Sequence, residues 1–314
     1  MFSLRTNHSN AAMASRPYCP SFVDIQLTLP QHNSSNRDYL MSPISKLPVE
    51  VLSSIFLQTR DLELESKPKP SPYFPALDPL NPLNCHATPW ILSNVSHRWR
   101  AIAETTPSLW RLLNVEITDE LDRVLNSSRT KEGVPEIVAQ RMIERVKRWI
   151  ENALPKHDSN YLLSGDGPGL LQVSYRNSGW FIRRWDLLLW ESSLFPYAQA
   201  IARLDVSAHY NLFPLLDGLK GRVARLEALK FDVQGMNQTY RLRLDAFAGS
   251  RLRSVEINGV SRFWETIALP WEQMAECNIS ETSITDSLNV FSLAPNLERF
   301  AVRTVGIKND GPFR

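Results

Sequence analysis

The sequence contains few cysteines and no long apolar run. Its three cysteines, Cys19, Cys85 and Cys277, are odd in number and far apart, which argues against a disulfide framework and for a reducing compartment. No stretch approaches the roughly 18 apolar residues that a membrane helix needs. The first 22 residues lack the apolar segment of a secretory signal. They carry Arg5 and Arg16 with no acid before Asp24, a faint likeness to a transit peptide, but a disordered tail is the favoured interpretation. We therefore expect a protein of the cytoplasm or nucleus that does not bind membranes.

A strong excess of charge is also missing. The formal net charge of the 314 residues is +2, with 43% hydrophobic and 22% charged residues. This is the composition of an ordinary globular chain, long enough for one large domain or two smaller ones. A nearly neutral chain offers no general electrostatic case for nucleic acid or an anionic surface.

Motifs that support catalysis or metal binding are absent as well. Cys85 and His86 adjoin in a proline-rich stretch without a second ligand pair at metal spacing. The glycines of residues 164–169 lack the Lys-Ser/Thr ending of a phosphate-binding loop, and Pro168 interrupts them, so a connector is the favoured interpretation. No Gly-x-Ser-x-Gly is present, and the six histidines have no acid at a suggestive spacing. We expect no enzyme, no cofactor and no metal.

The chain divides by composition. Residues 1–42 are rich in Ser, Asn and Pro without periodicity, which predicts a disordered tail. Residues 58–88 contain a dense run of prolines, which predicts an exposed loop. Residues 112–117 alternate in polarity like a strand, and Pro135 opens an amphipathic helix that ends before Pro155. We treat residues 114–160 as a connecting strand and helix.

Residues 161–314 contain strand-like segments at a nearly fixed interval. Each has an apolar residue, a second three positions later and a third two positions after that. The sets begin at residues 201, 226, 252, 274 and 297, at steps of 25, 26, 22 and 23. They are Ile201-Leu204-Val206, Leu226-Leu229-Phe231, Leu252-Val255-Ile257, Met274-Cys277-Ile279 and Leu297-Phe300-Val302. The interval lies within the 20 to 29 residues of leucine-rich repeats, in which a strand alternates with a helix or turn.

Other segments fit between these strands. Leu170–Tyr175 is interpreted as a degenerate earlier strand, residues 185–194 as a helix, and residues 212–219, 244–248 and 288–293 as helices or turns. The Asn or Cys of a strict leucine-rich consensus is mostly missing, so the repeats are irregular. A solenoid normally ends in a polar cap, and its absence after the last set leaves truncation of the chain as one interpretation.

The most informative stretches are residues 47–57 and 89–113. In the first, Pro48 suits the opening of a helix and Glu50 complements its dipole. Apolar residues then recur at spacings of three and four: Val51, Leu52, Ile55 and Phe56. In the second, we expect one helix, which Thr88 caps, Pro89 opens and Pro107 ends. Its apolar residues on one side are Leu92, Val95, Trp99 and Ile102.

These two stretches resemble the F-box in the form common in basidiomycete fungi, whose pattern is LPxEILxxIF, then VCRRWRxIA, then TPxLW. The matching residues are Leu47, Pro48, Glu50, Val51, Leu52, Ile55, Phe56, Val95, Arg98, Trp99, Arg100, Ala101, Ile102, Ala103, Thr106, Pro107, Leu109 and Trp110. Ser96 stands where the family has cysteine, and His97 where it has the first arginine. The piece Ala294–Glu298 also resembles the APNLE junction of fungal F-box repeat proteins.

The resemblance implies a fold and a function. The expected fold is α/β: a small helical F-box over residues 43–113, with residues 58–88 as an insertion, followed by an irregular leucine-rich-repeat-like solenoid of short parallel strands and helices. The implied function is that of a non-catalytic substrate receptor of a cullin-RING ubiquitin ligase. A Skp-type adaptor, and through it a cullin, would bind the F-box, and an unknown target protein would bind the repeats. The residues expected to dock or shape the adaptor surface are Leu47, Pro48, Val51, Leu52, Ile55, Phe56, Val95 and Trp99.

Two alternatives stay open. In one, the protein is a repeat-based interaction scaffold without a ligase, and the helices only cap the repeats; coverage of the Leu47–Phe56 stripe by the repeats would favour it. In the other, less favoured, basic and aromatic residues at 145–149 and 180–185 bind nucleic acid. Acids among them favour a simpler interpretation, in which the aromatic residues are core and the charges are solvated.

Overall fold

The computed structural model describes residues 43–65, 81–84, 87–117, 134–154, 171–177, 179, 184–234, 244–260, 263–280 and 284–303. The chain forms two compact units, Met1–Leu47 and Pro48–Arg314. The described part of the first is a 3-10 turn, η2 (Pro43–Lys46), after which the Leu47 N–H donates to the Ile44 carbonyl at 3.3 Å. The predicted tail 1–42, the prolines at 68–79, the Cys85-His86 pair and the glycines at 164–169 lie outside the described residues.

The second unit begins with a cluster of short helices: α1 (Val49–Glu65), α2 (Thr88–Val95), α3 (His97–Glu104) and the 3-10 turn η3 (Pro107–Trp110). The prediction of one continuous helix after Pro89 is wrong. Ser96 has an extended backbone, and its side chain accepts the Trp99 N–H at 3.2 Å, so it ends α2 and caps α3. The predicted cap at Thr88 is also wrong, because Thr88 is already helical and Ala87 precedes the helix without a side-chain hydrogen bond.

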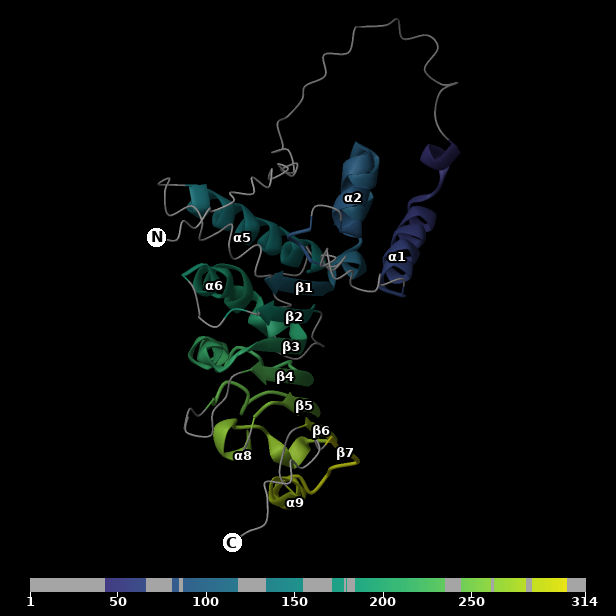
Figure 1. Ribbon diagram of the computed structural model, residues 1–314. Helices are drawn as coiled ribbons and strands as arrows, with labels where there is room; N and C mark the ends of the chain where they lie inside the picture. The colour runs from purple at the N-terminus through teal and green to yellow at the C-terminus, as the bar shows by residue number, and fades with distance from the viewer. Residues whose placement is uncertain are drawn as a thin grey trace, which may run out of the picture. The chain divides into compact units, whose positions relative to one another are not determined.

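The remainder of the unit is built on one sheet of seven parallel strands in chain order (Figure 1). The strands are β1 (Leu112–Ile117), β2 (Leu171–Asn177), β3 (Ile201–His209), β4 (Ala228–Gln234), β5 (Ser254–Asn258), β6 (Glu276–Ser280) and β7 (Arg299–Arg303). Helices and turns connect them, so the predicted α/β class with alternating parallel strands and helices is confirmed at this level. The interpretation of Leu170–Tyr175 as an earlier strand agrees with β2, and the sheet extends one strand further toward the N-terminus than expected, because β1 also belongs to it.

The register of the sheet follows the apolar spacing seen in the sequence. Leu204, Leu229, Val255, Cys277 and Phe300 are successive partners across β3 to β7, and Val206, Phe231, Ile257, Ile279 and Val302 form a second row. The same rows continue through β2 into β1. The interval of 22 to 26 residues therefore adds one strand at a time without a shift in the rows from β3 onward.

The connecting segments supply apolar partners for these rows. They are α5 (Val134–Ala153), α6 (Arg184–Leu189), the π-helical turn η5 (Trp190–Leu194), η6 (Phe195–Ala200), η7 (Tyr210–Leu212), α7 (Phe213–Leu216), η8 (Asp217–Leu219), α8 (Phe263–Thr266), η9 (Trp271–Gln273) and α9 (Ile284–Leu293). Phe213 and Phe247 lie 6.0 and 5.6 Å from the Phe231 ring. One face of the sheet is thus the core of the unit.

Burial along the rows is almost complete until the last strand. Val206, Phe231, Ile257 and Ile279 are at most 2% exposed, but Val302 of β7 is 37% exposed. Leu288 and Phe291 of α9 are also exposed, and the Phe291 ring lies 4.6 Å from that of Phe300. Among the described residues, β7 has a neighbouring strand on only one side.

Candidate functional site

The helical cluster has a filled interior. Leu52 and Phe56, four residues apart on α1, are fully buried, and the Phe56 ring packs against Trp99 at 5.0 Å. The Ser53 and Thr106 hydroxyls lie 3.2 Å apart, and the Arg60 guanidinium donates to the Ser108 carbonyl. Helix α1 is therefore held by α2, α3 and η3.

Three tryptophans join this cluster to α5. The Trp90, Trp110 and Trp149 rings lie edge to face, with centroids 5.1 to 5.7 Å apart. Their indole N–H groups donate to the carbonyls of Pro82, Ala103 and Trp110 at 3.1, 2.7 and 2.7 Å. Such pairs stabilise beyond simple burial, and an Arg148–Glu104 ion pair of 2.7 Å lies nearby.

The predicted adaptor residues separate into three groups. Pro48, Val51 and Val95 are exposed, with Val51 at 43% and Val95 at 55%. Ile55 and Trp99 are half-buried, as is Leu47, which belongs to the first unit. Leu52 and Phe56 are buried, so of the residues expected to dock or shape the adaptor surface these two lie in the interior. Their cover includes the cluster's own Trp99.

Sequence reasoning did not single out two further exposed apolar residues of these helices. Val49 of α1 and Ile91 of α2 are about half exposed. Ile91 stands four residues before Val95, a spacing that places both on one side of α2. With Val51 they give α1 and α2 several apolar side chains in contact with solvent. Only Ile91 and Val95 are placed on one side of the same helix by their spacing.

The face of the sheet opposite the core is polar. From β3 to β7 its side chains bind one another: Ser207 to Asp232 at 3.1 Å, Lys230 to Glu256 at 2.7 Å, and Ser254 to Glu276 at 3.3 Å. Arg299 also pairs with Glu276, and Ser280 bonds to Asn258. We call this surface the polar face. Its β4–β7 carboxylates have partners on this face, whereas Asn278 Oδ1 of β6 is buried without a hydrogen-bond partner among the described residues.

The β1–β3 part of the polar face differs. Arg176 of β2 and Arg203 of β3 are exposed, and Asp205 lies between them along the strand direction. Burial raises the pKa of the Asp205 carboxyl, while Arg176, Lys230 and Arg203 act in the opposite direction. Among the described residues, neither arginine forms a hydrogen bond or a close ion pair.

Buried polar atoms without partners lie in the same region. Asn114 Oδ1 of β1 and Ser174 Oγ of β2 have no hydrogen-bond partner within the described part of the chain. Ser174 pairs with Asn114 on one side and Asp205 on the other, so the three residues form one row. Such atoms are costly when left unsatisfied.

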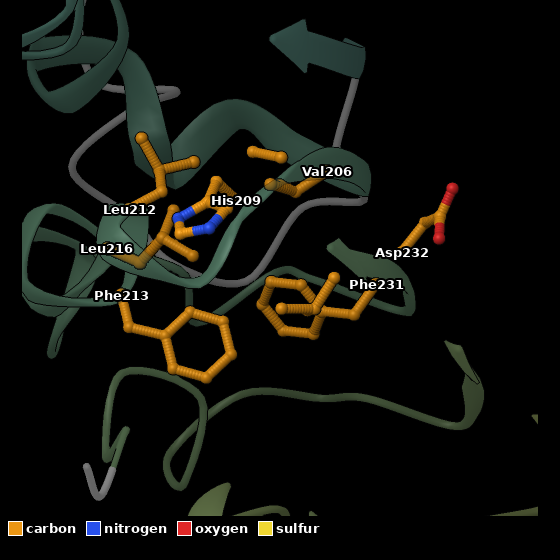
Figure 2. Close-up of a pocket in the computed structure, with 9 residues that line it drawn as sticks. Val206, His209, Leu212, Phe213, Leu216, Phe231 and Asp232 are labelled. Atoms are coloured by element: carbon orange, nitrogen blue, oxygen red, sulfur yellow. The ribbon is translucent and has the colours of Figure 1, made fainter. Parts of the chain in front are cut away.

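A small hollow lies where β3 and β4 end (Figure 2). It is lined mainly by apolar residues such as Leu212, Phe213 and Phe231 and encloses a volume of about 0 Å³, too little for a water molecule. In Figure 2 the Asp232 carboxylate points away from these side chains, and it accepts from Ser207 on the polar face. Burial lowers the pKa of His209, whose ring packs against Tyr210 at 4.3 Å. The hollow is below the roughly 300 Å³ of small-molecule sites.

The basic and aromatic cluster at residues 145–149 does not offer a base-stacking surface. Trp149 is fully buried among the three tryptophans, Arg148 pairs with Glu104, and Arg145 donates to the Leu83 carbonyl at 3.4 Å. At the second cluster, residues 180–183 lie outside the described range, and Trp185 is half-buried.

Two searches of the described residues bear on other classes of site. No three His, Cys, Asp or Glu side chains in that part of the chain are grouped as metal ligands. Over the same residues, every helix is too short or too polar to span a bilayer.

Comparisons of the chain with protein-family models, with curated proteins and with solved structures give no match.

Proposed function

We propose that this protein is a non-catalytic substrate receptor of a cullin-RING ubiquitin ligase. In this proposal residues 43–113 are an F-box that binds a Skp-type adaptor, and residues 161–314 are an irregular leucine-rich-repeat-like solenoid that holds a target protein. The receptor would act in the cytoplasm or nucleus. No covalent step belongs to it; it raises the effective concentration of target lysines near an enzyme that carries ubiquitin.

The observation that carries the proposal is the contrast between the two sides of the helical cluster. Leu52 and Phe56 fill its interior, whereas Val51 and Val95, which match the same family pattern, remain in contact with solvent. A folded cluster that keeps these apolar side chains outside gains by covering them with a second protein. Pro48, Val51 and Val95 are therefore the proposed contacts, with Ile55 at their margin, while Leu52, Phe56 and Trp99 shape the surface from below.

The test is a binding measurement between the purified full chain and a Skp-type adaptor. Val51→Glu and Val95→Glu should each weaken binding at least tenfold, about 1.4 kcal/mol, because a carboxylate would be buried in an apolar contact. Ile137→Glu is the matched control, since Ile137 is 56% exposed on α5, and it should leave binding unchanged. Circular dichroism verifies the fold of each variant. Wild-type protein that does not bind, or folded V51E and V95E variants that bind as wild type, would overturn the proposal.

A second candidate is a repeat-based scaffold without a ligase. The burial of Leu52 and Phe56 is compatible with it, because those residues can act as core of a capping cluster, although their cover includes Trp99 of that cluster. A target that binds to the sheet-bearing part of a chain unable to bind any adaptor would support this alternative.

A further inference from the structure

The backbone of β7 has one edge that the described residues leave open. The Arg299 N–H donates to the Ala275 carbonyl at 3.0 Å, so it points toward β6. Successive residues of a strand direct their N–H and C=O groups to opposite edges, so those of Phe300 and Val302 point away from β6. On that side the described part of the chain holds no further strand. This edge can therefore form the main-chain hydrogen bonds of one more strand.

The apolar core is also uncovered at this edge. In the middle of the sheet, the Phe231 ring packs against Phe213 from the connection before its strand and Phe247 from the connection after it, at 6.0 and 5.6 Å. The Phe300 ring has its equivalent of the first contact in Phe291 of α9, at 4.6 Å. The described residues end at Arg303, so among them no connection follows β7 to supply the second.

Four apolar side chains border the open edge on the core side of the sheet. Phe300 is half-buried, and Val302, Phe291 and Leu288 are 37%, 53% and 62% exposed. Leu288 and Phe291 are three residues apart, a spacing that places both on one side of α9, which lies beside β7 (Figure 1). An added strand removes apolar surface from water most effectively when its own residues opposite Phe300 and Val302 are apolar.

The polar face adds a charge requirement at the same edge. Arg299 pairs with Glu276 of β6, whereas the register partner of Arg303 is the uncharged Ser280. Arg303 contributes to the lowered pKa of the Glu256 carboxyl, two strands away, but that carboxylate is bound by a lysine of β4. Among the described residues, Arg303 forms no hydrogen bond or close ion pair. A carboxylate on the added strand, opposite Arg303, would supply one.

We propose that the open edge of β7 binds an extended segment of a partner protein, which joins the sheet as a further strand. Apolar residues two positions apart lie opposite Phe300 and Val302, and an acid at the adjoining position pairs with Arg303. The pattern is apolar-x-apolar-acid for a parallel segment and acid-apolar-x-apolar for an antiparallel one. In this mode of recognition, main-chain hydrogen bonds give affinity and alternate side chains give specificity.

A second copy of β7 and a helix both fit this edge less well. The residues of β7 on the polar face are Arg299, Ala301 and Arg303, so another copy of the strand brings no acid opposite Arg303. A helix has its backbone groups paired internally, so it leaves those of Phe300 and Val302 without partners. An extended segment of another protein meets the apolar, charge and backbone requirements together.

This inference goes beyond the proposed function, because it does not involve an adaptor, and its test is carried out without one. The probe is a fluorescein-labelled synthetic peptide containing Glu-Ile-Thr-Ile-Glu, which carries the pattern in both directions. A peptide containing Glu-Ile-Ile-Thr-Glu has the same composition and charge but breaks the alternation. A third, with Lys-Ile-Thr-Ile-Lys, reverses the charge. Fluorescence anisotropy with the full chain measures binding.

The first peptide should bind at least tenfold more tightly than either of the others. Arg303→Glu should reverse the preference between the glutamate and lysine peptides. Val302→Pro should abolish binding, because proline lacks the outward N–H yet is tolerated on an edge strand, whereas Val302→Ile should stay within twofold of wild type. Arg141→Glu, at an exposed arginine of α5, is the matched control for charge and should also stay within twofold. Circular dichroism verifies each fold.

Equal binding of the alternating and rearranged peptides, or a folded Val302→Pro variant that binds as wild type does, would overturn the inference. So would a dimer in sedimentation velocity that the first peptide dissociates, because the occupant would then be a second copy. A chain ending at Arg303 that binds the peptide at least tenfold more tightly than the full chain would instead identify residues 304–314 as the occupant, and would overturn it as well.

Discussion

Replacing Trp110 with phenylalanine should weaken the link between the helical cluster and α5. Trp110 is fully buried between Trp90 and Trp149. Its indole N–H donates to the Ala103 carbonyl at 2.7 Å, and that hydrogen bond disappears in the variant. The Ala103 carbonyl still accepts the Thr106 N–H at 3.2 Å, so it is not left unsatisfied.

Two contributions set the size of the effect. A buried hydrogen bond of this kind contributes about 1 kcal/mol net. The smaller ring leaves a void of roughly 40 Å³, which at about 24 cal/mol per Å³ costs about 1 kcal/mol more. The edge-to-face arrangement with Trp90 and Trp149 is retained in part by phenylalanine. We expect Trp110→Phe to lower the free energy of unfolding by about 2 kcal/mol.

The control is the same chemical change at Trp185. That side chain is half-buried, and its Nε1 has no acceptor within the described residues. Trp185→Phe removes no hydrogen bond and should cost less than about 0.5 kcal/mol. Urea titrations of the full chain, followed by circular dichroism at 222 nm, give both values by linear extrapolation. The reasoning is refuted if the two variants are equally destabilised, or if W110F is as stable as wild type.

Two further changes test the sheet. Gly259 has a φ of +73°, and a Cβ built there would overlap the Val233 carbonyl oxygen, whereas Gly221 has a φ of +72° and open space around it. Gly259→Ala should therefore lower the melting temperature by several degrees more than Gly221→Ala, and equal shifts would contradict the overlap. Burial raises the pKa of the Cys277 thiol from its ordinary value of 9.0 to about 12. A raised folded pKa gives stability that is present below the unfolded pKa and lost as the pH rises toward 12, up to about 4 kcal/mol for a shift of three units. Urea midpoints between pH 8 and 11 should fall more steeply for wild type than for Cys277→Ala, and parallel curves would exclude this role.

The sequence predicted the sheet better than the site. The repeated spacing of three apolar residues, at positions i, i+3 and i+5, is enough to place Leu204 and Val206 beside Leu229 and Phe231. It suffices because side chains alternate along a strand and the interval between repeats hardly varies. The break at Ser96 was missed although serine is a common helix cap, since Leu92, Val95, Trp99 and Ile102 keep a helical period across it.

Periodicity also does not tell what covers a stripe. Leu52 and Phe56 share a side of α1 that the sequence left open, and only the structure shows Trp99 packed on it. The three-tryptophan contact could not be inferred, because Trp90, Trp110 and Trp149 are distant in the sequence and no spacing rule joins them. The polar face was accessible in principle: Arg203, Asp205 and Ser207 alternate with Leu204 and Val206, and aligning those polar residues with β2 would have revealed the charges.

The last strand, β7, has a consequence for how the protein behaves in concentrated solution. A strand with one unpaired side is a template on which other chains can stack, and in the described residues β7 is such a strand. If two copies met there antiparallel and centred on Ala301, Arg299 of one would oppose Arg303 of the other. Because Arg299 pairs with Glu276 of its own chain, this like-charge repulsion is partial, and because it is screened by ions, it weakens further as salt is added.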